Sequence, residues 1–201
     1  MMKLYFAPKT RSTRPRWMLE ELGIPYELVT VDLSKGEHKR PDYLRVHPMG
    51  SVPALEDDGQ AVFESAAILE HLADRFPEKG LAPAVGTPAR GEYYAWMMFC
   101  MATLEPALAT VASHTHFLPE AERVPSEAER GRKRFAELAR MLEEKLRGRE
   151  FLVGDGFTAA DVLLASILGW ARGSGLLADF PGLQAYVQRH MARPAAQRAM
   201  K

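Results

Sequence analysis

The stretch from Met49 to Leu55 places a proline where it favours peptide binding. Asp57-Asp58-Gly59 follows as a hairpin turn signal, so Pro53 stands at the entry of a strand, a position that tolerates proline. A proline between apolar neighbours there is a candidate for a cis bond, which would turn the backbone N–H and C=O of Val52 outward. Such an exposed pair hydrogen-bonds an extended peptide. The pattern therefore predicts a peptide-binding edge at Val52.

Glu64-Ser65 opens a helix a short distance further on, because apolar residues recur at helical spacing from Ile68 to Phe76. Ser65 is thus expected at a helix N-terminus, where free N–H groups and the helix dipole favour a carboxylate. Taken singly, Ser65 is an ordinary helix cap and Pro53 an ordinary strand-entry proline. Together they predict an edge for a peptide backbone and, close by, a socket for its acid group.

The pair V-P-A-L and E-S-x-A-I resembles the glutathione-binding half of the cytosolic glutathione transferases, in a bacterial serine- or threonine-type form similar to the beta and theta classes. The resemblance implies that glutathione is the co-substrate and that its thiolate attacks a small electrophile. It also implies a homodimer with the site near the subunit interface, and it implies no metal. The glutathione-binding residues that it indicates in the two motifs are Val52, Pro53, Glu64 and Ser65. Ser51 stands where many relatives have lysine or glutamine, so one polar contact to the tripeptide is expected to be altered. In the loop before the motifs, Lys35 and His38 are candidates to reach the glycine carboxylate.

The loop between the first expected strand and helix holds the candidates for activating the thiol. A thiol of pKa near 8.5 is only about 3% ionised at neutral pH, and lowering that pKa by roughly two units requires about 2.7 kcal/mol. One hydrogen bond to the sulfur together with a helix N-terminus supplies this amount. Ser12 is the first choice as donor and Thr10 the second. Capping of the helix is the alternative role for both.

Two further residues near this loop are weaker candidates for catalysis. Arg11 occupies the position at which similar bacterial proteins hold a cysteine one residue before a serine, so redox chemistry through a protein cysteine is not expected. Its charge would favour the thiolate, although a solvent-facing arginine is an equal alternative. Tyr5 faces away from its apolar strand neighbours and is a second alternative as donor.

The first half of the chain shows the pattern of an α/β domain. Alternation over 3–7 and 26–33 predicts two strands, and helical spacing over 14–22 predicts a helix between them, so the strands are expected to be parallel. The polar segment 34–48 is expected to be a mobile loop with a short helix. With the strand, hairpin and helix at the two motifs, the order is βαβαββα, a thioredoxin-like plan.

The second half shows only helical periodicity. Segments 89–114 and 127–147 read as two antiparallel helices of a bundle. Thr158 and Asp161 have capping-box spacing, and T-x-A-D resembles the start of the core helix in the all-helical domain of the same family. We expect a thioredoxin-like glutathione-binding domain at 1–78, a linker at 79–88, and an all-α helical bundle at 89–201.

The electrophile would lie against the helical domain. The residues that could form an apolar wall there are Tyr94, Met98, Met101 and Trp170. Methionine and aromatic residues at helical spacing are more often core, which is the competing interpretation.

Composition excludes several classes of function. Lysine plus arginine and aspartate plus glutamate number 26 each, so no nucleic acid or anionic membrane partner is expected. Cys100 is the single cysteine, which excludes a disulfide framework and a multi-cysteine metal site and agrees with a reducing compartment. Neither a signal peptide nor an apolar run of membrane length is expected. The prediction is a soluble cytoplasmic protein.

Two alternatives to a conjugating enzyme remain. The first is a non-catalytic, glutathione-transferase-like interaction protein, because fold alone does not settle function. The second is an enzyme that uses glutathione for an isomerisation or a reduction. The intact motifs at Val52-Pro53 and Glu64-Ser65, together with the loop hydroxyls, favour the conjugating enzyme.

Overall fold

The computed structural model describes all of residues 1–201. Contacts divide the chain into two compact units: unit 1 comprises Met1–Ala82 and Ala192–Lys201, and unit 2 comprises Pro83–Met191. The ranges expected from sequence, 1–78 and 89–201 with a linker between them, differ from this division at the C-terminus. Residues 192–201 follow the helical segment in sequence but belong to unit 1 by their contacts.

Unit 1 contains a four-stranded mixed sheet with strand order β2-β1-β3-β4. Its strands are β1 (Met2–Phe6), β2 (Tyr26–Thr30), β3 (Ala54–Asp57) and β4 (Gln60–Phe63). β1 pairs in parallel with β2 and antiparallel with β3, and β3 and β4 form the predicted hairpin. Buried Leu4 lies opposite Leu28 on one side and buried Leu55 on the other. The parallel pairing predicted for the first two strands is confirmed.

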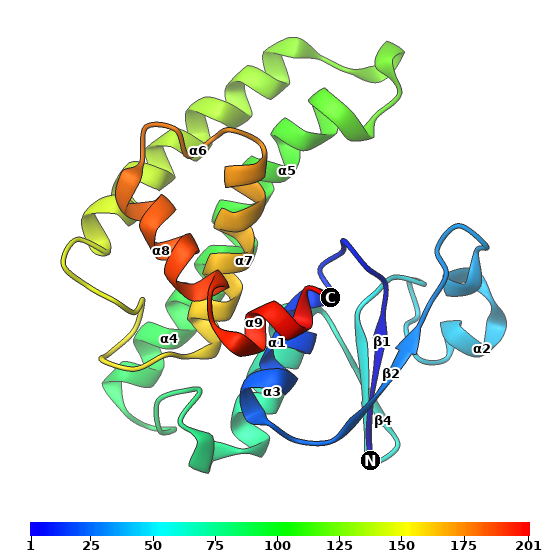
Figure 1. The fold of residues 1–201 in the computed structure, drawn as a ribbon. Helices are drawn as coiled ribbons and strands as arrows, with labels where there is room; N and C mark the ends of the chain where they lie inside the picture. The colour runs from blue at the N-terminus through cyan, green and yellow to red at the C-terminus, as the bar shows by residue number, and fades with distance from the viewer. The chain divides into compact units, whose positions relative to one another are not determined.

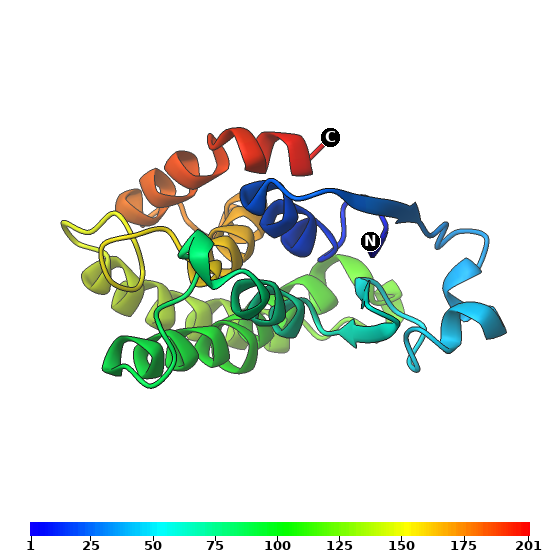
Figure 2. The ribbon, with the colours of Figure 1, turned by 90° about the horizontal axis from the view of Figure 1, so that it is seen from below.

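The helices of unit 1 complete the predicted order. They are α1 (Thr13–Leu22), α2 (Pro41–Leu44), α3 (Ser65–Arg75) and α9 (Pro194–Ala199), with short 3₁₀ turns at Glu37–Lys39 and Pro77–Lys79. α3 and α9 lie on either side of α1, which packs against both (Figure 2). Fully buried side chains from α1, α3 and the sheet form the core: Leu4, Trp17, Met18, Leu19, Leu22, Leu55, Ile68, Leu69 and Leu72.

β2 ends at Thr30, earlier than the alternation up to Leu33 suggested. Asp32 causes the early end, because its carboxylate accepts the backbone N–H of Ser34 at 3.0 Å and its hydroxyl at 2.6 Å. A side chain that satisfies backbone donors in this way favours a turn over a continuing strand. The segment that follows holds the 3₁₀ turn and α2, so it contains two short helices where one was expected.

Unit 2 is all helical. Its helices are α4 (Pro88–Phe99), α5 (Glu105–Ala112), α6 (Pro125–Lys145), α7 (Ala159–Gly173) and α8 (Pro181–Met191). α5 and α6 run side by side in opposite directions, as predicted for the first two long helical segments (Figure 1). α7 is the core helix, because ten of its 15 residues are buried.

α4 and α5 form one continuous helical stretch, since the π-helical segments Cys100–Leu104 and Ser113–Phe117 join them and extend them. The stretch Pro88–Phe117 is long and apolar enough, by length and composition, to cross a membrane. The expectation that no apolar run approaches membrane length was therefore wrong on those two criteria. In the fold, 44% of its most apolar window is buried, and the core helix of a globular unit passes the same test.

The capping box predicted at the start of α7 is confirmed. Asp161 Oδ2 accepts the backbone N–H of Thr158 at 2.8 Å, and Oδ1 accepts the backbone N–H of Leu152 at 2.8 Å and the hydroxyl of Tyr186 at 2.6 Å. Asp161 is fully buried, so these bonds are made away from water. The carboxylate thus joins α7 to the preceding loop and to α8, well beyond the role of a helix cap.

Candidate functional site

The predicted peptide edge forms at the turn before β3. The Val52–Pro53 bond is cis, as predicted, and no hydrogen bond within the protein engages the backbone N–H or C=O of Val52. Ser51 has an exposed side chain, and its carbonyl oxygen accepts the hydroxyl of Tyr43 at 2.5 Å. That bond ties the turn to α2. The backbone of Val52 is therefore available to a ligand on a turn that its neighbours hold in place.

Lys39 also holds this turn, and sequence reasoning missed it. Its Nζ donates to the carbonyl oxygens of Met49 and Gly50, each at 2.9 Å. Gly50 has φ +57°, and a Cβ there would approach the His38 carbonyl oxygen to 2.4 Å, so this position requires glycine. The only signal in the sequence was Met49-Gly50 itself. A glycine there indicates a tight turn, and the carbonyl oxygens of such a turn are available to a nearby cation.

The two loop residues predicted to reach a glycine carboxylate lie differently from each other. Lys35 is exposed and its Nζ pairs with Asp32 Oδ2 at 3.0 Å. That pairing raises the pKa of Lys35, first through the hydrogen bond to Asp32. His38 is partly buried, and its Nδ1 has no hydrogen-bond partner. Both stay proposals for the glycine end.

Ser65 stands at the start of α3, as predicted. Its side chain is 3% exposed, and its Oγ accepts a hydrogen bond from Arg14 Nη1 at 3.2 Å. Because Oγ serves there as acceptor, the hydroxyl proton of Ser65 remains for a ligand. Glu64 before it has φ +69°, a strained conformation for a residue other than glycine. Strain of this kind concentrates at functional sites, where surrounding structure maintains it.

Arg14 is a site residue that sequence reasoning missed. It lies in the first turn of α1, is 2% exposed, and brings a guanidinium group to the N-terminus of α3. A buried cation beside a helix N-terminus strengthens the preference for a carboxylate. An arginine in an amphipathic helix ordinarily faces solvent, so its type and spacing carried no signal.

The two loop hydroxyls are brought together. Thr10 Oγ1 and Ser12 Oγ lie 2.8 Å apart, Thr10 Oγ1 also lies 2.7 Å from the Ala7 carbonyl oxygen, and the Ala7 N–H reaches Ser12 Oγ at 3.4 Å. Each hydroxyl has one proton, so when Thr10 donates to Ala7, Ser12 donates to Thr10. Ser12 is 0% exposed, whereas Thr10 is only partly buried. Thr10 therefore presents the outer hydroxyl, and Ser12 lies behind it.

The two weaker candidates are not part of this pair. Arg11 is exposed on the loop. Tyr5 donates its hydroxyl to Glu56 Oε2 at 3.2 Å, and its ring packs edge-on against Tyr43 with centroids 5.5 Å apart. Burial and then the charge of Glu56 raise the pKa of Tyr5. Its proton is committed to Glu56, so Tyr5 has no part in the site proposed below.

The residues predicted to form an apolar wall lie in unit 2 in two places. Tyr94 and Met98 are one turn apart on α4 and are 43% and 52% exposed. Met101 follows in the π-helical segment and is partly buried. Trp170 lies on α7, where its ring pairs with that of Phe117 at a centroid distance of 6.4 Å. Exposure of Tyr94 and Met98 supports a binding role for them over a core role.

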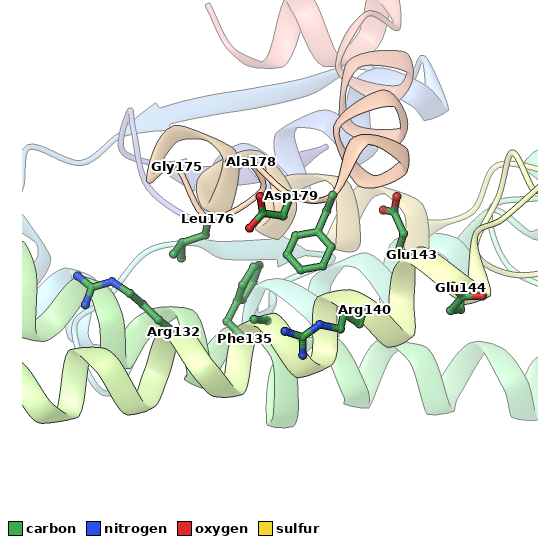
Figure 3. Close-up of a pocket in the computed structure, with 11 residues that line it drawn as sticks. Arg132, Phe135, Arg140, Glu143, Glu144, Gly175, Leu176, Ala178 and Asp179 are labelled. Carbon is green, nitrogen blue, oxygen red and sulfur yellow. The ribbon is translucent and has the colours of Figure 1, made fainter.

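A surface depression of about 630 Å³ lies elsewhere on unit 2. It is bounded by α6 and the segment between α7 and α8, and Figure 3 shows Arg132, Phe135 and Arg140 of α6 facing Leu176 and Asp179 of that segment. None of the predicted site residues lines it. The depression is therefore separate from the site predicted from sequence. That site consists of a strand edge and a helix N-terminus, which can bind a ligand without a deep cavity.

Sequence profiles of known families decide the identity of the chain. The profile described as glutathione S-transferase, N-terminal domain, matches residues 1–74, and that of the C-terminal domain matches residues 95–194. The chain belongs to the glutathione S-transferase family. Two relatives of this glutathione S-transferase span it almost completely. Glutathione S-transferase GST-4.5 of Xanthomonas campestris pv. campestris is 34% identical over 201 residues, covering 100% of this chain and 98% of the relative. Disulfide-bond oxidoreductase YfcG of Escherichia coli K12 is 30% identical over 208 residues, covering 100% and 94%.

Solved structures agree with the family and with its ligand. A glutathione transferase from Methylococcus capsulatus has a TM-score of 0.88 at 34% identity, covering 100% of this chain and 97% of that one. A sphingomonad glutathione S-transferase complexed with glutathione has a TM-score of 0.85 at 31% identity, covering 98% and 96%. The protein is therefore a transferase with the thioredoxin-like and all-helical domains of its family, and glutathione is supported as its ligand.

Proposed function

We propose that this glutathione S-transferase joins the thiolate of glutathione to a small, largely apolar electrophile. The observation that carries the proposal is the arrangement at the start of α3. There the Ser65 hydroxyl, backed by the buried cation of Arg14, offers a proton to a carboxylate. The γ-glutamyl carboxylate of glutathione is the group that fits this socket. Free backbone groups of Val52 then suit the cysteinyl residue of the tripeptide.

The thiol is activated by the hydroxyl pair of the loop. Thr10, the outer member, turns its proton from the Ala7 carbonyl oxygen to the thiolate, and Ser12 donates to Thr10 from behind it across 2.8 Å. Two hydroxyls in series polarise each other, so the outer one becomes a stronger donor. This order reverses the preference drawn from sequence, because Thr10 is the more exposed of the two hydroxyls. Glutathione acts as co-substrate, and no metal takes part in this mechanism.

The direct test combines a rate with a spectrum. Purified protein and glutathione are assayed against activated aryl halides, epoxides and unsaturated carbonyl compounds, and the thiolate absorbance of bound glutathione is titrated with pH. The proposal expects conjugation with at least one class and a thiol pKa well below that of free glutathione. If the protein binds glutathione but leaves its thiol pKa unchanged, the non-catalytic interaction protein replaces the enzyme.

A second reaction of the same thiolate is favoured by one relative, the disulfide-bond oxidoreductase YfcG. Glutathione thiolate attacks a small disulfide, releases one thiolate and forms a mixed disulfide; a second glutathione then releases the other thiol and leaves oxidised glutathione. The protein needs no cysteine for this, which agrees with the burial of its single cysteine, Cys100. The rate at which oxidised glutathione forms when a small disulfide is added is compared with the rate of conjugation. This comparison distinguishes a reductase from a transferase.

The assembly and setting belong to the same proposal. A cytoplasmic homodimer that detoxifies electrophiles, without nucleic acid or membrane partners, accords with one buried cysteine and balanced charge. Large apolar side chains are exposed on both units, among them Met49 and Phe63 on unit 1 and Met98 on unit 2. Sedimentation velocity at micromolar concentration tests the dimer, and a single monomeric species contradicts it.

A further inference from the structure

The C-terminal end of α1 is fastened to the C-terminal end of the chain. Glu21 and Arg193 form a bidentate ion pair, in which Arg193 Nε donates to Glu21 Oε1 at 2.6 Å and Nη2 donates to Oε2 at 2.8 Å. The same Glu21 Oε1 accepts the indole N–H of Trp17 at 2.9 Å. Arg193 is the residue immediately before α9. The Glu21 side chain is only 10% exposed, so water screens this pair less than it screens a surface pair.

A second ion pair repeats the attachment. Arg198, in the last turn of α9, donates from Nε to Glu20 Oε2 at 2.6 Å, and the other oxygen of Glu20 accepts the hydroxyl of Tyr26 on β2 at 2.8 Å. α9 itself buries three alanines, Ala195, Ala196 and Ala199. Small side chains allow two helices to approach closely. We call the set Glu20, Glu21, Arg193 and Arg198 the α1–α9 latch.

The opposite end of α1 carries the proposed chemistry. Arg14, about two turns before Glu21, reaches the Ser65 hydroxyl. The loop before α1 is joined to the helix by backbone bonds, from Thr13 N to Thr10 O at 3.3 Å and from Arg14 N to Arg11 O at 3.1 Å. A third bond, from Arg16 N to Ser12 O at 3.3 Å, ties Ser12 to the first turns of α1 in the same way. Ser65 and Val52 lie on other elements, α3 and the turn before β3.

Glutathione must contact both sets of groups at once, so the position of α1 relative to α3 and β3 decides whether one tripeptide fits them. α3 packs on one side of α1 and α9 on the other (Figure 2). We propose that the α1–α9 latch is a positioning device for glutathione, in which Glu21 and Arg193 hold α1 where the thiol donors and the carboxylate socket match. This inference rests on the proposed function. It adds residues that lie outside the glutathione contacts.

The test compares Arg193→Gln and Glu21→Gln with Arg75→Gln in the full-length protein. Arg75 is a suitable control, because it pairs with Asp58 at 2.7 Å within unit 1 but does not hold α1. Affinity for glutathione is measured by calorimetry, the thiol pKa of bound glutathione by thiolate absorbance, and folding by melting temperature. Both latch variants are expected to bind glutathione at least five-fold more weakly and to raise the thiol pKa, while Arg75→Gln changes neither.

A purely structural role gives a different result. In that case the latch variants melt at a lower temperature, yet the folded protein binds glutathione with wild-type affinity and lowers its thiol pKa as the wild type does. That result overturns the proposal. The double variant Arg193→Gln/Glu21→Gln is expected to lose no more affinity than either single variant, since both remove one interaction. Additive losses contradict a shared latch. Failure of the wild type to bind glutathione refutes the proposed function instead, so the two failures are distinguishable.

Discussion

At the scale of single residues, the contact between Arg14 and Ser65 makes the sharpest prediction. Ser65→Ala removes the proton offered to the γ-glutamyl carboxylate, and a hydrogen bond to a charged group contributes about 1.5 to 3 kcal/mol. We expect glutathione affinity to fall about ten-fold or more by calorimetry. Ser65 is the first helical residue and not the N-cap, so the fold should stay intact, although the variant loses the buried hydrogen bond from Arg14 and some stability with it.

Ser34→Ala provides the matched control for that measurement. Its hydroxyl also makes one side-chain hydrogen bond within unit 1, to Asp32, but at an exposed turn. Its affinity for glutathione should equal that of the wild type. Unchanged affinity in Ser65→Ala would remove Ser65 from the site.

The hydroxyl pair predicts a graded response of the thiol. Thr10→Val removes the outer donor, so the pKa of bound glutathione should rise and conjugation near neutral pH should slow, with recovery at alkaline pH as the thiol ionises unaided. Ser12→Ala removes only the donor behind it, so its shift should have the same sign and be smaller. Thiolate absorbance titrations measure both. A larger shift in Ser12→Ala would restore Ser12 as the direct donor, and a rate deficit that persists at high pH would indicate lost structure.

Which site residues could be predicted from sequence depends on how local their signals are. Val52-Pro53 and Ser65 were predictable, because strand entry and helix start are read from neighbouring residues, and both features are observed. Arg14 and Lys39 were not, since each acts on a segment distant in sequence, and an isolated arginine or lysine looks like surface. Burial of Ser12 was equally invisible, and it changes the order of the proposed donors.

At the scale of elements, Asp161 should govern the stability of the helical unit. Four donors converge on its buried carboxylate: the backbone N–H groups of Leu152 and Thr158 and the hydroxyls of Thr158 and Tyr186. Asp161→Asn turns an NH₂ group toward donors, and each buried group left unpaired costs about 1 to 3 kcal/mol. Thr158→Ala, which removes the cap alone, should cost about 1 kcal/mol.

In denaturant unfolding, Asp161→Asn should therefore have a clearly lower free energy of unfolding than Thr158→Ala. The glutathione affinity of the folded protein should stay unchanged in both variants. Equal losses in the two variants would reduce Asp161 to a helix cap. Affinity that falls without a loss of stability would place Asp161 in the binding site.

The α1–α9 latch predicts a response to acid. Burial alone would raise the pKa of Glu20, but hydrogen bonds from Arg198 and Tyr26 and the charge of Arg16 lower it below its ordinary value. Folding then favours the ionised form, so this stabilisation is full above about pH 4.5 and is lost as pH falls through the lower, folded-state pKa. Between pH 6 and pH 3.5 the wild type should lose more unfolding free energy than Arg198→Gln. Equal losses of unfolding free energy in the two proteins would show that the Glu20–Arg198 pair contributes nothing to stability.

The end of α1 could be predicted from sequence, whereas the end of β2 could not. Gly23 closes α1 in the left-handed conformation, and a glycine followed by a proline two residues on is a local sequence signal for a helix end. The continuous stretch 88–117 was expected as a helix over 89–114, but its two π-helical segments were not foreseen. Such segments depend on how one helix packs against its neighbours, and periodicity read along one chain does not report that packing.

At the scale of the whole molecule, unit 1 is discontinuous in sequence. The chain leaves it after Ala82 and returns at Ala192. Sequence reasoning assigned all of 89–201 to one helical domain, because every long periodic segment beyond the linker is helical. No local signal marks the return. Arg193, just before α9, and Arg198 within it find their partners only in the folded molecule, on a helix more than half the chain away.

The discontinuity predicts how a C-terminal deletion propagates. Removing residues 192–201 exposes the face of α1 that α9 covers and leaves the partly buried carboxylate of Glu21 without its cation. Amide hydrogen exchange, followed by mass spectrometry, should therefore accelerate in α1 and β2, whereas α6 and α7 of unit 2 should exchange as in the wild type. Deletion of Lys201 alone is the control and should change neither. If the longer deletion does not fold, Arg193→Gln/Arg198→Gln gives the same pattern at smaller amplitude. Faster exchange in α6 and α7 with α1 unchanged would show that α9 stabilises the helical unit, in conflict with the contacts that assign it to unit 1.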